Sequence, residues 1–209
     1  GRKGDYEVLK ALLKPLRAAG IPVLLSLGNH DNREAVEAVF PDAVILSNSA
    51  LAGRKAAVVP SPHADWYLLD SLEKTDFTPG RFGEEQLAWL ARSLDGNPAR
   101  PALMVAHHYP RKRDDDSGLL DTEAFRKVID PRRQVKAFFY GHSHNWSQQQ
   151  RDGIHFVNLP ALAWLFKEEG IPRAWVEAAV REDRADLAVH SMNGVDLPNG
   201  GKYTLRWRA

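Results

Sequence analysis

Five of the eight histidines fall into three short clusters that could bind a metal ion. The clusters are Asn29-His30-Asp31, His107-His108 and His142-Ser143-His144. Neutral imidazole and amide oxygen are ligands that suit Zn, Mn, Fe or Co and suit Cu(I) poorly. The sequence has no cysteine, which excludes thiolate zinc sites, disulfides and cysteine nucleophiles. An open, catalytic metal site is therefore favoured over a closed structural one.

Each cluster follows an apolar run that is typical of a buried strand. The runs cover residues 21–27, 102–106 and 135–140, and the last of them leads through Gly141 into its cluster. Ligands of α/β proteins bind beyond the carboxyl ends of such strands. Three strands of one sheet would therefore bring all three clusters to the same edge.

Strand and helix patterns alternate through the first two thirds of the chain, and strand patterns dominate the last third. Helices are predicted at 5–19, 33–39, 84–94 and 122–129, and further strands at 43–46, 56–59 and 66–69. Later strands are predicted at 146–150, 154–159, 175–180, 187–192 and 203–207, with Asp152-Gly153 as a hairpin turn. We expect an α/β sandwich in a single domain over 1–209, with an α/β part at 1–145 and a mainly antiparallel part at 146–209.

Composition excludes several classes of protein. With 28 basic and 27 acidic side chains in 209 residues, the net charge is +1, which argues against a dedicated nucleic-acid binder. The most apolar long stretch, residues 154–166, is too short and too polar to span a bilayer. The residues that follow Gly1 have no signal-peptide pattern, but a segment could precede Gly1, so both a cytoplasmic and an exported location stay open. The oligomeric state is also left open.

Each cluster alone has a plain structural interpretation. Gly28-Asn29 could be only a turn, and His107-His108 could be hydrogen-bonded loop residues. His142 and His144 are different, because side chains at i and i+2 on extended backbone point the same way. The three clusters together, in this order, favour a metal site.

The three clusters resemble the later motifs of the calcineurin-like metallophosphoesterase superfamily. The motifs are Gly28-Asn29-His30-Asp31, His107-His108 and Gly141-His142-Ser143-His144. The stretch Gly83-Glu84-Glu85-Gln86-Leu87-Ala88-Trp89-Leu90 resembles the class III cyclic-nucleotide phosphodiesterase and glycerophosphodiesterase branch. The resemblance runs from about residue 5 to about residue 166.

The resemblance implies a four-layer αββα sandwich with two divalent metal ions, which could be Mn, Fe, Zn or Co. By motif position, Asn29, His107 and His142 would hold one ion, and His144 would belong to the other. For the double histidine we choose His107 over His108 as the ligand.

The resemblance also implies a phosphoesterase, in particular a phosphodiesterase, that acts on a small phosphate ester and needs no covalent nucleophile. Two ions would lower the pKa of a shared water and supply a hydroxide for in-line attack on phosphorus. His30 would sit over the phosphate, stabilising charge or protonating the leaving oxygen, and Asp31 would orient it.

The sequence departs from the family pattern at its start. The family's Asp-x-His motif is absent, as is its Gly-Asp motif, whose Asp bridges the two ions, and Gly4-Asp5 follows no apolar strand. We therefore expect that the first strand–helix–strand portion lies upstream of Gly1 and that the chain alone is poorly active. The alternatives are a non-catalytic scaffold that lost these motifs and a mononuclear hydrolase of non-phosphate esters.

Other candidate residues have stronger structural interpretations. Arg111, Lys112 and Arg113 could steer an anion, but the acidic residues that follow favour a solvated loop. Trp164 and Trp146 could stack on a nucleobase, although core or hairpin packing is the default expectation. The remaining histidines are expected at the surface (His63) or in structural roles (His155, His190).

Overall fold

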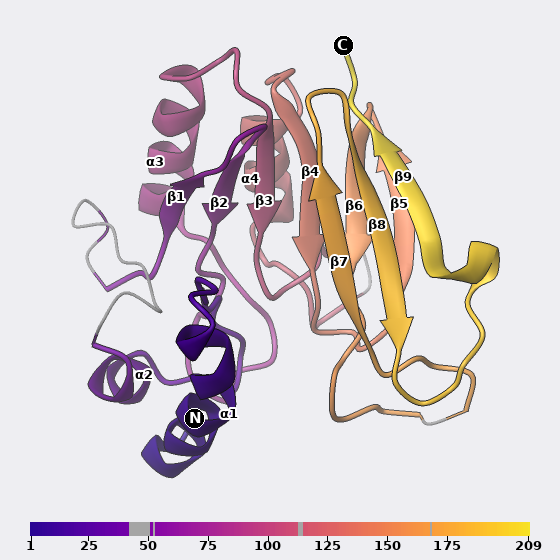
Figure 1. Cartoon of the computed structure of the whole chain (residues 1–209). Helices are drawn as coiled ribbons and strands as arrows, with labels where there is room; N and C mark the ends of the chain where they lie inside the picture. The colour runs from indigo at the N-terminus through magenta and orange to yellow at the C-terminus, as the bar shows by residue number, and fades with distance from the viewer. Residues whose placement is uncertain (42–50, 52, 113–114, 168) are drawn as a thin grey trace.

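Two β-sheets form the centre of the computed structural model, which describes residues 1–41, 51, 53–112, 115–167 and 169–209. The first sheet has six strands, in the order β1 (Ala57–Pro60), β2 (Asp65–Leu68), β3 (Ala102–Val105), β4 (Val135–Tyr140), β6 (Ile154–Asn158) and β5 (Ser147–Arg151). The second has three, in the order β7 (Ala174–Val180), β8 (Arg184–Ser191) and β9 (Lys202–Arg206). The helices are α1 (Lys3–Ala18), α2 (Arg33–Val39), α3 (Glu84–Asp95) and α4 (Thr122–Ile129), with a 3-10 turn η1 (Pro198–Gly201). Figure 1 shows the three-stranded sheet in front of β4, β6 and β5, where it packs on β4 and β6, and α1 and α2 below β1 and β2.

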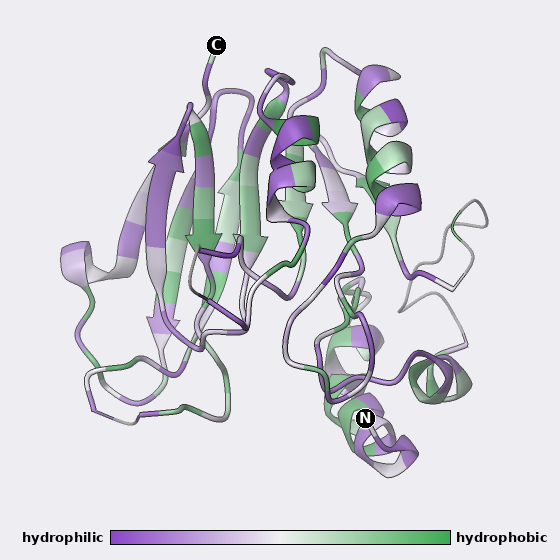
Figure 2. Cartoon of the chain, turned by 180° about the vertical axis from the view of Figure 1, so that it is seen from behind, coloured by the Kyte–Doolittle hydropathy of each residue, from purple (hydrophilic) through white to green (hydrophobic). Residues whose placement is uncertain are grey.

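The six-stranded sheet is parallel at its centre, where β2, β3, β4 and β6 run in the same direction. Strand β4 is buried on both faces, because Phe138 packs in the cluster with α3 and α4 while Phe139 packs in the cluster with the second sheet. Figure 2, the view from behind, places α3 and α4 on the near side of the sheet, with hydrophobic and hydrophilic residues on each helix. The continuous apolar runs at 102–106 and 135–140 thus mark strands that are covered on both sides.

The predicted α/β class is confirmed, and most predicted elements agree with the structure within a few residues. Asp152 and Gly153 both have positive φ, 50° and 78°, as a tight hairpin between β5 and β6 requires. That hairpin belongs to the six-stranded sheet, so the change of sheet comes after Asn158, and the division of the chain at residue 145 stays a prediction. The predicted strand 43–46 lies outside the described residues.

The predicted strand at residues 21–27 is wrong for this structure. The segment is irregular, and no described strand forms a ladder with it. Ile21 and Leu24 remain 51% and 37% exposed, whereas Leu27 is buried against α1 and α2. An apolar run becomes a strand only where a neighbouring strand pairs its backbone groups, so hydrophobicity alone did not decide this segment.

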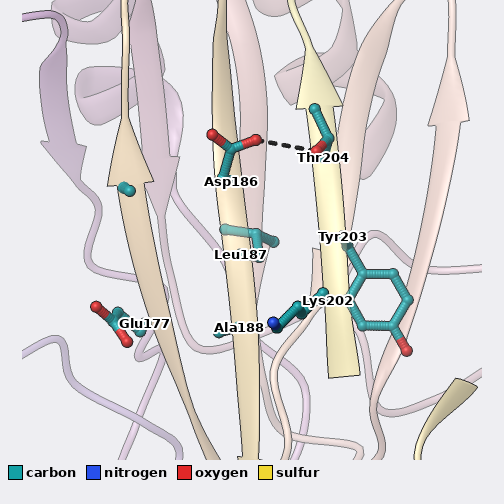
Figure 3. Close-up of a pocket in the computed structure, with 8 residues that line it drawn as sticks. Glu177, Asp186, Leu187, Ala188, Lys202, Tyr203 and Thr204 are labelled. Carbon is teal, nitrogen blue, oxygen red and sulfur yellow. Dashed lines mark hydrogen bonds between the residues drawn. The ribbon is translucent and has the colours of Figure 1, made fainter. Parts of the chain in front are cut away.

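The outer face of the second sheet is exposed, with no described helix over it. Glu177, Asp186, Lys202 and Thr204 line a shallow hollow of about 410 Å³ there, and Thr204 Oγ1 donates to Asp186 at 2.9 Å (Figure 3). The hollow contains no histidine, so it is separate from the three clusters. Helices α1 and α2 pack on each other in a hydrophobic cluster of their own, below β1 and β2 in Figure 1. Among the described residues, no helix is both long and apolar enough to cross a bilayer.

Candidate metal centre

The ends of β3 and β4 bring two of the histidine clusters together. The strands are parallel neighbours with Val105 opposite Phe139, so His107 and His142 both follow the same edge of the sheet. The backbone continues this pairing beyond the strands, because Gly141 N donates to His107 O at 2.9 Å. The prediction that parallel strand ends deliver these clusters to one edge is therefore confirmed for these two clusters.

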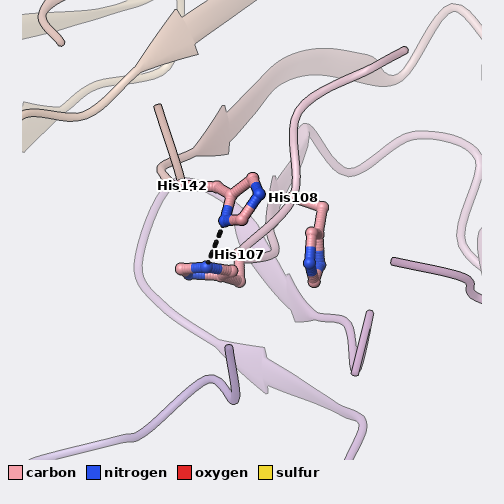
Figure 4. Close-up of side chains that lie close together, drawn as sticks. All are labelled: His107, His108 and His142. Atoms are coloured by element: carbon pink, nitrogen blue, oxygen red, sulfur yellow. Dashed lines mark hydrogen bonds between the residues drawn. The ribbon is translucent and has the colours of Figure 1, made fainter. Parts of the chain in front are cut away.

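The third cluster reaches the same place from the irregular segment. His107 Nε2 lies 3.1 Å from Asn29 Oδ1 and 3.0 Å from His142 Nδ1, and Figure 4 shows the two rings meeting. Gly28 makes the approach possible, because a Cβ on it would lie 2.9 Å from ring atoms of His107. Three of the four expected ligands thus converge, and their role in metal binding stays a prediction.

His108 is placed differently from His107. The ligand atoms of His107, His108 and His142 all lie within 4.8 Å of one another, but His108 is fully buried and both of its ring nitrogens are engaged. Nδ1 is 2.8 Å from Ser71 Oγ and Nε2 is 3.0 Å from Thr78 O. We therefore interpret His108 as a residue that packs the centre, while His107 presents a nitrogen to Asn29 and His142.

Burial keeps these imidazoles neutral. It lowers the pKa of His107 from 6.5 to about 3, with the neighbouring His108 and His142 adding to the shift. It also lowers the pKa of His108 to about 4, although the Thr78 carbonyl opposes this. The pKa values of His142 and His144 are lowered mainly by the same burial. A neutral imidazole is the form that can donate a lone pair to a metal ion.

The Gly-His-Ser-His loop differs from the extended backbone assumed for it. His142 and His144 have φ of 67° and 58°, in the left-handed region, so the i, i+2 argument does not apply. His142 turns toward His107, and His144 turns away to stack on Phe166 with ring centroids 4.6 Å apart. His144 lies outside the group of three histidines, as a ligand of a different ion would.

Asp31, which was expected to orient His30, has other hydrogen-bond partners in the structure, and its catalytic role stays a prediction. The Asp31 carboxylate instead accepts from the Tyr6 hydroxyl at 2.8 Å and from Gly28 N at 2.7 Å, which holds the turn closed. His30 Nδ1 is 2.8 Å from Asp76 Oδ1, and that hydrogen bond lowers the pKa of the Asp76 carboxyl.

Asp76 was missed by the sequence analysis, because it lies 46 residues away in a loop without periodicity. Two further contacts fix that loop on the turn, since Asp76 N donates to Asn29 O and Thr75 Oγ1 donates to Asp31 O, both at 2.7 Å.

The donor set fits a divalent cation. The Asn29 oxygen and the His142 nitrogen lie 3.1 Å and 3.0 Å from His107 Nε2, and a single proton on that nitrogen can serve only one of the two short contacts. His144 Nδ1 is buried with no hydrogen-bond partner among the described residues. A cation would satisfy acceptors that would otherwise be buried at a cost in free energy.

The centre opens into a cavity of about 620 Å³. Its lining includes the candidate ligands together with His30, Tyr109 and two aromatic residues, Trp164 and Phe166. The default expectation of core or hairpin packing is confirmed for Trp146, which packs on Tyr203. It is wrong for Trp164, whose side chain is 59% exposed.

The remaining sequence candidates lie away from the centre. His63 is exposed in its loop, His155 is 2.7 Å from Arg206 O, and His190 stacks on Trp175, in line with the structural roles expected. Arg111 pairs with Asp116 of its own loop at 3.3 Å, which supports the solvated-loop interpretation. Arg113 lies outside the described residues.

Comparison with known proteins gives a consistent picture. The model of the family described as calcineurin-like phosphoesterase matches residues 2–146. A 3′,5′-cyclic-nucleotide phosphodiesterase of Nostoc sp. is 27% identical over 176 residues, covering 81% of this chain and 60% of that protein. A probable cyclic nucleotide phosphodiesterase of Rhodopseudomonas palustris is 32% identical over 173 residues, covering 78% and 59%. This chain thus spans about 60% of the length of these relatives.

The same fold occurs in a solved structure. A dimetal phosphatase from Danio rerio superposes with a TM-score of 0.72 at 18% identity, covering 97% of this chain and 77% of that one. At this level of identity the similarity concerns the fold alone.

Proposed function

Because the chain belongs to the calcineurin-like phosphoesterase family, we propose that it hydrolyses phosphate esters, and phosphodiesters in particular. The observation that carries the proposal is the meeting of Asn29 Oδ1, His107 Nε2 and His142 Nδ1 within 3.1 Å contacts beyond the strand ends. The names of the Nostoc and Rhodopseudomonas relatives support a diester as substrate. Since the chain spans about 60% of these relatives, both the activity and the substrate are part of the proposal.

In this proposal Asn29, His107 and His142 hold one divalent ion, and His144 contributes to a second. When bound, such ions supply Lewis acidity that polarises phosphoryl oxygens and lowers the pKa of water toward neutrality. The protein keeps the imidazoles buried and neutral, and Gly28 leaves room for the His107 ring beside the turn. His108 packs against both ring ligands, with centroids 4.9 Å from His107 and 4.7 Å from His142, and so limits their movement.

His30 is the proposed proton donor to the leaving oxygen. Its side chain is 81% exposed at the edge of the cavity, and Asp76 accepts the hydrogen bond from Nδ1. The other ring nitrogen, Nε2, is therefore the one that can face a substrate. As the bond between phosphorus and the leaving oxygen breaks, that oxygen takes a proton from His30 Nε2, a role that contributes roughly 10²–10⁴-fold to rate.

A second candidate is a non-catalytic role in which the fold binds a partner. Among the described residues, only His107, His108 and His142 form a close group of three or more potential His, Asp or Glu ligands. His144 alone is a weak basis for a second ion. This chain should therefore bind one ion more tightly than the other, and any hydrolysis of phosphate esters that it catalyses should be slow.

Metal binding and hydrolysis measured on the same samples test the proposal. We expect the protein to bind Mn²⁺ by calorimetry and to hydrolyse bis(p-nitrophenyl) phosphate, with p-nitrophenyl acetate as the test for non-phosphate esters. His142→Ala should lose both properties, and His63→Ala, at an exposed loop position, is the matched control. Mn²⁺ binding without phosphodiester hydrolysis would favour the scaffold, and failure to bind Mn²⁺ would contradict the metal centre itself.

A further inference from the structure

Two large aromatic side chains remain exposed at the candidate metal centre. Trp164 is 59% exposed and Phe166 is 68% exposed, although both line the cavity that contains the candidate ligands. Side chains of this size are usually well buried on average. Their exposure inside a cavity therefore needs a reason other than core packing.

The rings of Trp164 and Phe166 form one surface, which we name the aromatic wall. This surface contacts the His144 imidazole. Phe166 stacks on His144 with centroids 4.6 Å apart and an angle of 28° between the rings. Trp164 meets His144 edge-on at 5.2 Å and meets Phe166 at 4.6 Å. Such contacts hold aromatic rings in defined orientations, so the wall is fixed directly beside a candidate ligand.

The other side of the centre has a different chemistry. A hollow of about 410 Å³ adjoins the cavity through the shared residues Tyr109 and Ser143. Its lining is largely polar and includes the amides of Asn145, Gln148 and Gln149 together with the charged groups of Lys112 and Asp115. Amides suit hydroxyl-bearing groups through hydrogen bonds, whereas the wall offers only flat apolar faces and edges.

We propose that the aromatic wall binds a planar aromatic ring of the substrate, of the nucleobase class, and so selects ring-bearing phosphate esters over aliphatic ones. The inference rests on the proposed function, which puts the phosphorus group beside His107, His142 and His144. From there a substituent of the phosphate reaches the wall once it extends past His144, because the ring centroids of Phe166 and Trp164 lie 4.6 Å and 5.2 Å from the centroid of the His144 ring. Base stacking on such rings tolerates any base, because every base has a π-face.

The test compares two probes that share the phosphate and the sugar and differ in the ring. Dissociation constants of adenosine 5′-monophosphate and ribose 5-phosphate are measured by calorimetry with Mn²⁺ present. We expect the wild-type protein to bind the nucleotide more tightly, and Trp164→Ala to reduce the ratio of the two constants by on the order of tenfold. Trp164→Phe, which keeps a flat ring, should retain most of the ratio.

Trp175→Ala is the matched control, because Trp175 is 48% exposed on β7 and stacks on His190 away from the cavity. It should change neither constant. If Trp164→Ala and Phe166→Ala both bind the two probes and leave the ratio of the dissociation constants unaltered, the proposed role of the aromatic wall is overturned but the proposed function is not. Failure of the wild-type protein to bind either probe would instead contradict the proposed function, and with it the proposed role of the aromatic wall.

Discussion

Replacing Gly28 by alanine should disturb the metal centre without unfolding the protein. An alanine Cβ at this position would lie 2.9 Å from His107 Cε1 and Nδ1 and 3.0 Å from Cγ. Carbon atoms in contact normally lie about 3.5–4.0 Å apart. Gly28 is not among the glycines with positive φ, so alanine can adopt the backbone and the conflict is with the His107 ring.

The size of the effect follows from these distances. To relieve the contacts, the imidazole or the turn must shift by roughly 0.5–1 Å. His107 Nε2 has contacts of only 3.0 Å and 3.1 Å to His142 and Asn29, so a shift of this size breaks the convergence of the three groups. Overpacking of this kind costs about 1–3 kcal/mol of stability. Misplaced ligands of similar severity lower metal affinity roughly 10- to 100-fold.

The assay is calorimetric titration with Mn²⁺, together with thermal unfolding in EDTA to verify that the variant is folded. Gly4→Ala is the control, because a Cβ there meets nothing within 4 Å. That change lies in α1 and should raise stability slightly, by about 0.5–1 kcal/mol, and leave Mn²⁺ binding unchanged. A folded Gly28→Ala protein with wild-type affinity for Mn²⁺ would refute the placement of His107 at the centre.

Three further predictions concern the surroundings of the centre. Asp76→Asn should lower kcat for bis(p-nitrophenyl) phosphate by at least about tenfold with little change in Mn²⁺ binding, because it weakens the hydrogen bond that holds His30, the proposed proton donor. Equal kcat in variant and wild type would show that Asp76 does not orient His30. Asp70→Ala should lower the free energy of unfolding in urea by about 3–5 kcal/mol, because it removes the fully buried carboxylate whose two oxygens both bond Arg33. The guanidinium then keeps its bond to the Leu72 carbonyl but has no anionic partner among the described residues. A loss under about 1 kcal/mol would contradict this. The metal-free protein should become less stable as pH falls from about 6.5. The folded-state pKa values of His107 and His108 are about 3 and about 4, so below pH 6.5 the unfolded chain binds protons at these histidines that the folded protein does not. A melting temperature in EDTA that stays constant from pH 7 to pH 5 would argue against buried neutral rings.

The sequence predicted those parts of the molecule that follow from local patterns. Strands β3 and β4 are apolar runs that are buried on both faces, and their parallel pairing explains why His107 and His142 meet. The polarity of parallel strands is enough to infer a common edge without knowing any contact.

Other features depended on contacts that no local pattern reveals. The pairing of His30 with Asp76 joins residues far apart through a loop. The left-handed conformations of His142 and His144 come from the loop as a whole. Residues 21–27 have the composition of a strand, but strand formation depends on a partner for the backbone, which the local sequence does not specify.

Anomalous diffraction from crystals of this protein grown with Zn²⁺ tests the central claim most directly. We predict a metal peak about 2.0–2.1 Å from His107 Nε2 and His142 Nδ1, with the Asn29 oxygen also in contact. A weaker peak beside His144 would agree with the second site. Zinc bound elsewhere on the protein, with these three side chains still joined to one another by hydrogen bonds, would contradict the metal centre.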